Sequence, residues 1–173
     1  MSALRIVQLL QNKGLTLVPV ESCTGGSLMA AITDIPGASG VLADGFMTYS
    51  NEAKILLGVP AQVIATYSVY SLETAREMAK AGIRQSVRAS LGIGITGSLS
   101  RLDPANPASS KVGEVFIVLV KSTSGNLQDV ARACIKVSET DRVKAKQQVV
   151  SAALQLLEVA LMADLPPLVE IED

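Results

Sequence analysis

Residues 15–35 read LTLVPVESCTGGSLMAAITDI, and this stretch decides the fold. The short apolar run at 15–20 is typical of a buried strand, although Pro19 weakens that interpretation or marks the strand's end. A polar loop, ESCTGG at 21–26, comes next, and the residues of 27–35 then favour a helix. Strand, tight loop and helix in this order indicate one unit of an α/β fold.

The rest of the chain continues this alternation. Further strands are expected at 40–49, 91–96, 112–120 and 127–137. Helices are expected at 2–13, at 51–58, from Ser71 onward and from Glu139 onward. The last two strands are separated only by a short polar turn, so they predict an antiparallel hairpin and hence a mixed sheet.

Composition excludes several classes of protein. The 173 residues include 15 Lys and Arg against 16 Asp and Glu, and this net charge of −1 argues against a general nucleic-acid binder. No apolar run reaches the roughly 18 residues of a membrane span. The sequence has no His, which excludes Ser-His-Asp and Cys-His catalysis and any His-containing zinc site. We therefore expect no metal, no cofactor, no nucleic-acid partner and no membrane partner.

The two cysteines, Cys23 and Cys134, lie far apart and lack the paired spacing of metal ligands. They imply no disulfide framework, so a reducing cytoplasm is the expected location. The N-terminus also lacks a signal-peptide pattern. Cys134, on the second strand of the hairpin, is interpreted as a small core residue.

Three polar segments follow predicted strands, at 21–26, 50–54 and 97–111. Ligands of α/β sheets usually bind at the carboxyl ends of strands. In the first segment, a Ser and two glycines stand before a helix, whose free N–H groups can hold a phosphate or a developing oxyanion. Ser22 or Thr24 could be a nucleophile, or either could simply cap the helix in a tight turn.

A serine nucleophile needs a base, and lysine is the usual substitute where His is absent. Lys54 in the second segment is the best candidate, with Tyr49 placed to position or relay a proton. Ser50 and Lys54 are four residues apart and share a face if 50–58 is helical. The alternative is that Lys54 is an ordinary solvated lysine.

The third segment and the last helix offer further charged groups. The 97–111 loop contains Arg101, Asp103 and Lys111 and could close over a phosphate, or it could be a surface connection. Near the start of the last helix, Asp141 and Arg142 could hold an anion or form a solvated pair.

Taken together, ESCTGG at 21–26, TYSNEAK at 48–54 and GxTG at 94–97 resemble the CinA C-terminal domain family. ITDIPGASG at 32–40 and KVGEVF at 111–116 fall where family members carry similar sequence. The resemblance runs from about residue 4 to residue 163. It implies a single three-layer α/β/α domain with a mixed sheet, occupying 1–164, and a tail at 165–173 that is exposed or docks on a partner chain. It also implies a homo-oligomer.

The resemblance implies an enzyme of pyridine nucleotide salvage, a nicotinamide-nucleotide amidase that converts nicotinamide mononucleotide to nicotinate mononucleotide and ammonia without a metal. Ser22 would attack the carboxamide carbon, Lys54 would be the base, and Tyr49 would move the proton or hold the hydroxyl. Backbone N–H groups near 24–26 would bind the oxyanion. The residues assigned to binding this nucleotide substrate are Glu21, Thr24, Gly25, Gly26, Ser50, Asn51, Gly97 and Arg142.

This chain departs from the family pattern around the expected pocket. Where members commonly read GxAGPxGG, residues 94–101 read GITGSLSR, and Tyr70 replaces a smaller residue. These changes leave three alternatives open beside the leading hypothesis. The chain could hydrolyse another small carboxamide, it could be a non-catalytic nucleotide-binding or regulatory protein, or it could use Cys23 as nucleophile with Glu21 and Lys54.

Overall fold

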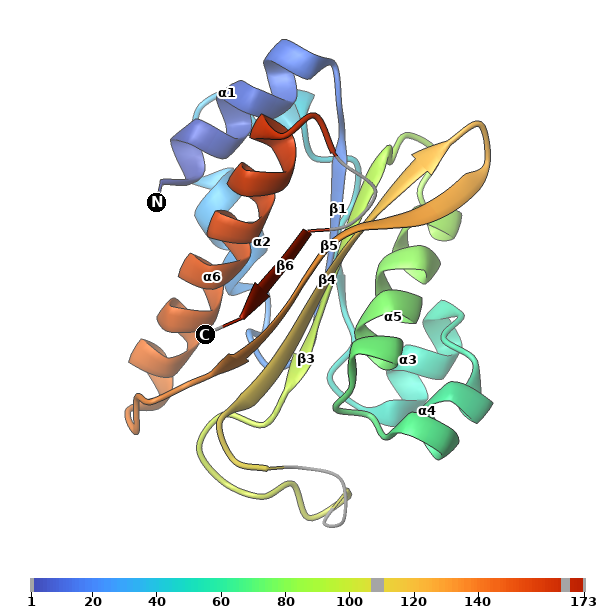
Figure 1. Cartoon of the computed structure of the whole chain (residues 1–173), viewed down its shortest axis with the longest axis vertical. Helices are drawn as coiled ribbons and strands as arrows, with labels where there is room; N and C mark the ends of the chain where they lie inside the picture. The colour runs from blue at the N-terminus through green and yellow to red at the C-terminus, as the bar shows by residue number, and fades with distance from the viewer. Residues whose placement is uncertain (1, 107–110, 166–168, 173) are drawn as a thin grey trace.

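The structure, a computed structural model, describes residues 2–106, 111–165 and 169–172. A mixed sheet forms the middle layer, and helices cover both of its faces (Figure 1). One face carries α1 (Ala3–Lys13), α2 (Ser27–Thr33) and α6 (Arg142–Met162), and a short 3-10 helix, η1 (Ala38–Gly40), follows α2. The opposite face carries α3 (Asn51–Leu57), α4 (Ala61–Tyr67) and α5 (Leu72–Gln85). The predicted three-layer α/β/α architecture is confirmed.

The strands of the sheet lie in the order β2-β1-β3-β4-β5-β6. Their bounds are β1 Leu17–Glu21, β2 Phe46–Met47, β3 Leu91–Gly97, β4 Glu114–Thr123, β5 Asn126–Lys136 and β6 Val169–Glu172. β1 pairs parallel with β2 and β3, and β3, β4 and β5 pair antiparallel in turn. The predicted mixed sheet and its β4–β5 hairpin are confirmed, and the carboxyl ends of β1, β2 and β3 share one edge.

Apolar side chains pack on both faces of the sheet. The larger core lies between the sheet and α1, α2 and α6, and contains Ile6, Leu28, Ile93 and Leu157. Smaller cores under α5 contain Ala75, Met78 and Val118. Every residue of β1 and β3 is buried, as expected for central strands covered by helices on both faces.

Pro19 lies inside β1, not at its end. The backbone groups of Leu17 and Glu21 form hydrogen bonds on the side of β1 that faces β2. Pro19 lies two residues from each of them, so its backbone faces the same side. On that side the pairing is interrupted between an isolated bridge at Leu42 and the start of β2 at Phe46. Because proline has no N–H to donate, this gap in the pairing accommodates it.

Three elements differ from the sequence prediction, and one of them is β2, which covers only Phe46–Met47 of the strand expected at 40–49. α4 was not expected; it buries none of its residues, so its sequence lacks the apolar stripe that reveals most helices. The tail was expected to be exposed or to dock on a partner, whereas β6 at 169–172 pairs parallel with β5 of the same chain. Residues 107–110 of the predicted loop and 166–168 of the tail lie outside the described residues.

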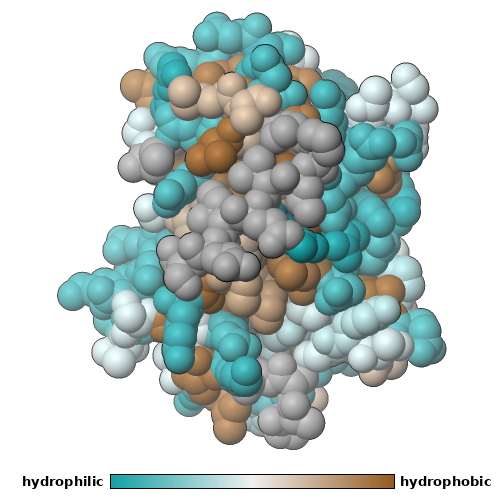
Figure 2. Space-filling model, viewed as in Figure 1, coloured by the Kyte–Doolittle hydropathy of each residue, from teal (hydrophilic) through white to brown (hydrophobic). Residues whose placement is uncertain are grey.

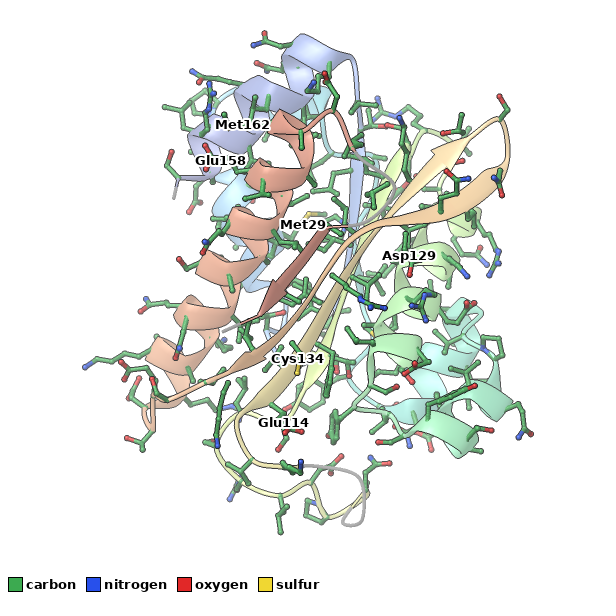
Figure 3. The ribbon with its side chains drawn as sticks, viewed as in Figure 1. Met29, Glu114, Asp129, Cys134, Glu158 and Met162 are labelled. Carbon is green, nitrogen blue, oxygen red and sulfur yellow. The ribbon has the colours of Figure 1, made fainter. Side chains whose placement is uncertain are left out.

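The prediction that Cys134 is a core residue is wrong. Cys134 is exposed on β5, and Figure 3 shows it on that strand. Its neighbours Ala133 and Ile135 are buried in the larger core, and successive side chains of a strand point to opposite faces. Cys134 therefore points to the face of α5, which packs mainly over β1, β3 and β4 and leaves this part of β5 uncovered.

Figure 2 shows the hydrophobic side chains of one face as separate patches among hydrophilic ones. Among the described residues, no helix combines the length and the apolar character that crossing a membrane requires.

Gly94 allows α5 to pack closely on β3. A Cβ at this position would lie 2.0 Å from the Ala75 carbonyl oxygen, which is backbone and cannot move aside. We expect Gly94→Ala to destabilise the fold by about 3 kcal/mol, measured by urea unfolding. Gly40→Ala is the matched control, because a Cβ at Gly40 meets nothing within 4 Å. Equal stability of the two variants would contradict this account of the packing.

Candidate active site

The three polar segments meet at the edge of the sheet where β1, β2 and β3 end. They surround a pocket of about 570 Å³, within the usual size range of small-molecule sites. Its wall includes Ser22 and Cys23 after β1, Tyr49 to Glu52 and Lys54 after β2, and Gly97 to Leu99 with 101–106 after β3. Val69, Tyr70 and Arg142 complete it. The three segments that follow predicted strands therefore come together in one pocket.

Ser22 and Lys54 are in direct contact in this pocket. The Lys54 ammonium donates to Ser22 Oγ over 3.1 Å and to the Thr48 carbonyl oxygen over 2.7 Å. Lys54 is only 1% exposed and Ser22 only 4%, so the interpretation of Lys54 as a solvated surface lysine is wrong. A nucleophile and a base within hydrogen-bond reach form the minimal unit of serine catalysis.

Local sequence places each member of this pair. The Ser22 N–H donates to the Ile95 carbonyl of β3, which fixes the residue beside the neighbouring strand. Ser50 caps α3 by accepting from the Ala53 N–H over 3.0 Å, a common N-cap arrangement. Lys54 follows one turn later on α3 and points back toward the end of β1, where the Thr48 carbonyl holds its amine.

Burial determines the charge states of Lys54 and of the neighbouring Cys23. Burial lowers the pKa of Lys54 to about 8, because the charged ammonium loses its hydration there. Burial raises the pKa of the Cys23 thiol to about 12. Lys54 can therefore lose its proton near neutral pH, whereas Cys23 keeps its own and is a poor nucleophile.

Tyr49 lies in the pocket wall but away from the Ser22–Lys54 contact. Its side chain is 62% exposed, and its hydroxyl accepts from Arg142 Nη2 over 3.0 Å. The structure thus joins Tyr49 to Arg142, the first residue of α6. The predicted role of Tyr49 in proton movement remains a prediction.

The structure places Glu21 and the residues of 24–26 apart from the pocket wall. The Glu21 carboxylate is buried and accepts from the N–H groups of Leu28 and Met29 over 3.0 and 2.8 Å. It therefore closes the first turn of α2, where a negative charge is stabilised. Thr24 is fully buried, and Gly25 and Gly26 form the positive-φ turn that leads into α2.

The other predicted binding residues line the pocket. Asn51 donates from its side-chain amide to Asn106 Oδ1 over 2.9 Å. Gly97 ends β3, and a Cβ there would lie 2.5 Å from the Glu114 carbonyl oxygen. Ser50 lines the pocket as well as capping α3.

Two features of the site escaped the residue-by-residue reasoning. The Thr48 carbonyl, which accepts from Lys54, is a backbone group, so the identity of residue 48 does not predict this contact. The Tyr70 hydroxyl donates to Asp103 Oδ2 over 2.6 Å and links the segment before α5 to the loop after β3. Tyr70 departs from the family pattern and Asp103 was a candidate charged residue of the loop, but nothing in the sequence pairs the two. Within the described part of the chain, no group of His, Cys, Asp or Glu could hold a metal ion.

Comparison with known proteins decides the family. The family model described as CinA C-terminal domain matches residues 2–161. The chain belongs to the CinA C-terminal domain family. A CinA-like protein of Chloroherpeton thalassium is 38% identical over 160 residues, which cover 91% of this chain and 37% of that protein. Another CinA-like protein, of Citrifermentans bemidjiense, is 42% identical over 121 residues, which cover 69% of this chain and 28% of that protein. The chain thus spans only about a third of the length of these relatives.

Solved structures of CinA relatives share the fold over nearly the whole chain. The competence/damage inducible protein CihA from Agrobacterium tumefaciens is 33% identical with a TM-score of 0.77, covering 92% of this chain and 93% of that one. A CinA superfamily protein from Klebsiella pneumoniae is 25% identical with a TM-score of 0.79. The match covers 93% of this chain and 96% of that one.

Proposed function

We propose that this CinA domain is an amide hydrolase that converts nicotinamide mononucleotide to nicotinate mononucleotide and ammonia. The observation that carries the proposal is the buried Ser22–Lys54 contact at the pocket, 3.1 Å between Oγ and Nζ. A lysine held in such a place, with its pKa lowered to about 8, has the properties of a general base. Family membership adds the amide substrate implied by the sequence resemblance.

In the proposed reaction the neutral Lys54 amine removes the proton from Ser22 Oγ, which attacks the carboxamide carbon. We assign the resulting oxyanion to backbone N–H groups of the turn that follows Ser22. Lys54 then passes the proton to the leaving nitrogen, and ammonia departs as the C–N bond breaks. Water attacks the acyl-serine with Lys54 again as base, releases the acid and restores Ser22. No step requires a metal or a cofactor.

The pocket also offers charges suited to a mononucleotide. Arg101 and Arg142 bring two guanidinium groups to its wall, and guanidinium groups bind phosphate through paired hydrogen bonds. Arg142 is oriented by its contact with Tyr49. We therefore assign binding of the phosphate to these two arginines.

The test is a metal-free incubation of the purified protein with nicotinamide mononucleotide, in which ammonia and nicotinate mononucleotide are measured together. The proposal expects equal amounts of both. A second candidate is hydrolysis of another small carboxamide, because the pocket wall departs from the family pattern at Tyr70, Ser98 and Arg101. A panel with nicotinamide, its riboside and aliphatic amides separates the two candidates. If the second is right, ammonia comes from a member of the panel and not from the mononucleotide. Tight binding of the mononucleotide with no release of ammonia from it or from any member of the panel would refute both.

The pH dependence of the rate provides a further prediction. Only neutral Lys54 can act as base, so the rate should rise with pH and level off above the pKa of about 8. At pH 7 it should be roughly a tenth of its plateau value. Steady-state rates between pH 6 and about 9.5 measure this. A rate that stays constant over the range would remove Lys54 from the role of base.

A further inference from the structure

The segment 98–106, which follows β3 and lines the pocket, is attached to the rest of the domain at both of its ends. At its start, the Ser98 N–H donates to the Glu114 carbonyl over 3.0 Å, and the Ser98 carbonyl accepts from the Gly113 N–H over 2.7 Å. Ser98 Oγ also donates to the Arg101 carbonyl over 2.8 Å. These bonds hold the start of the segment against the beginning of β4.

The far end of the segment is attached through the carboxylate of Asp103. Its Oδ2 accepts from the Tyr70 hydroxyl over 2.6 Å and from Asn106 Nδ2 over 2.7 Å. Its Oδ1 accepts from the Ala105 N–H over 3.0 Å. Asn106 Oδ1 in turn accepts from Asn51 Nδ2 over 2.9 Å. The segment is thereby tied to the residues before α5 and to the first residue of α3.

Tyr70 is a fixed point for this attachment. The carbonyl of the preceding residue, Val69, accepts from Thr96 Oγ1 of β3 over 2.9 Å, in a buried contact. The following residue, Ser71, caps α5 by accepting from the Thr74 N–H over 3.1 Å. Because the backbone on either side of Tyr70 is bound to the sheet and to α5, its hydroxyl holds the segment 98–106 against a rigid part of the domain.

Arg101 lies between the two attachments and lines the pocket. Among the residues that the structure describes, no carboxylate forms an ion pair with it, so its guanidinium is available to a phosphate. An arginine on an unrestrained loop would bind phosphate weakly, because the loop and the side chain would lose conformational freedom on binding. Attachment of the backbone on both sides of Arg101 removes part of that cost before the ligand arrives.

We propose that Tyr70 and Asp103 are positioning residues that hold Arg101 at the pocket wall, so that their contact sets the preference for a substrate carrying a phosphate. Arg101 is the residue that touches the phosphate, and the other two act through it. The inference rests on the proposed function for the identity of the ligand, nicotinamide mononucleotide, but ligand binding is measured without turnover.

The experiment is calorimetric titration with nicotinamide mononucleotide and with nicotinamide riboside, which lacks the phosphate. All proteins carry Ser22→Ala, so that neither ligand is consumed. Tyr70→Phe removes only the hydroxyl, and it should weaken binding of the mononucleotide by about tenfold, as expected for loss of a hydrogen bond to a charged group. Binding of the riboside should stay within about twofold. Tyr67→Phe is the matched control, because Tyr67 is an exposed tyrosine of α4 outside the pocket wall.

Asp103→Ala separates positioning from simple electrostatics. Hydrogen bonds from Tyr70 and Asn106 keep the pKa of the Asp103 carboxyl below its usual range, so it is negatively charged at neutral pH. If Asp103 were only a negative charge beside the phosphate, its removal would strengthen binding of the mononucleotide. Positioning predicts the opposite sign, a loss of about tenfold or more, again with little change for the riboside.

A double-mutant cycle tests whether Tyr70 acts through Arg101. In protein that carries Arg101→Met, the further change Tyr70→Phe should not weaken binding of the mononucleotide again. The inference is overturned if the single variants bind the mononucleotide as tightly as the Ser22→Ala protein or more tightly. It is also overturned if they lose the riboside equally, or if the full effect of Tyr70→Phe persists beside Arg101→Met.

Failure of the proposed function has a different signature. Absence of ammonia release by the parent protein, with the binding differences as expected, would refute amide hydrolysis and leave the positioning of Arg101 intact. Equal affinity of the Ser22→Ala protein for the mononucleotide and the riboside would refute the positioning role, whether or not the parent protein hydrolyses the amide.

Discussion

Replacing Ser22 by alanine is expected to abolish amide hydrolysis while leaving the fold nearly unchanged. The hydroxyl is the group that attacks the substrate, and removal of a serine nucleophile lowers kcat by at least about 10⁴-fold. The loss to the fold is small, because Lys54 keeps its bond to the Thr48 carbonyl and no large cavity is created. Turnover, thermal unfolding and equilibrium binding of nicotinamide mononucleotide measure the three effects.

Cys23→Ala is the matched control for this variant. Cys23 lies beside Ser22 in the same pocket wall, and its high thiol pKa of about 12 argues against a nucleophilic role. We expect it to retain most of the activity. Full activity in Ser22→Ala together with inactivity in Cys23→Ala would reverse the assignment and make the cysteine the nucleophile.

Replacing Lys54 by methionine is expected to lower kcat by about 10³-fold, the usual contribution of a general base. Methionine has a similar length and no ionisable group, so the residual rate should also lose its rise with pH toward about 8. Lys136→Met, which changes an exposed lysine on β5, should leave both the rate and its pH profile unchanged. A Lys54→Met enzyme with the parent's rate would exclude Lys54 from the mechanism.

The same substitution should make the protein more stable. Lowering the pKa of Lys54 to about 8 means that charged Lys54 destabilises the fold by roughly 3 kcal/mol. Loss of the bond to the Thr48 carbonyl offsets about 1 kcal/mol of this, so the melting temperature should rise by roughly 4–8 °C. Below pH 8 both the folded and the unfolded protein carry the proton and the gain is complete. Above pH 8 the folded protein loses the proton first, and the gain shrinks.

That stability test separates a functional lysine from a structural one. A Lys54→Met variant that is less stable than the parent at pH 7 would mean that the ammonium supports the fold. The burial of Lys54 would then need no catalytic explanation.

The Ser22–Lys54 pair was predictable because its placement depends on topology. Both residues follow strands of one parallel set, and parallel strands bring their carboxyl ends to a common edge. The helix that carries Lys54 was also predictable, since Ser50 and Gly58 mark its two ends. Apolar residues that recur every 2 residues in strands and every 3.6 residues in helices were enough to predict most of the sheet and its covering helices.

Other features depend on tertiary contacts that no local pattern records. Glu21 was expected to bind substrate, yet its carboxylate caps α2, because a buried charge needs partners and the N–H groups lie closest. The Tyr49 hydroxyl accepts from Arg142, which is 93 residues away in the sequence. The Tyr70–Asp103 contact joins two segments whose sequences each indicate only a loop.

The most direct test of the account is a search for the acyl-enzyme. Protein turning over nicotinamide mononucleotide is quenched in acid, digested and analysed by mass spectrometry. Nucleophilic attack by Ser22 predicts an adduct on this residue with the mass of the substrate less ammonia, and the adduct should be absent from Ser22→Ala. Turnover accompanied by the same adduct on Cys23, or by no adduct and an undiminished rate in Ser22→Ala, would contradict it.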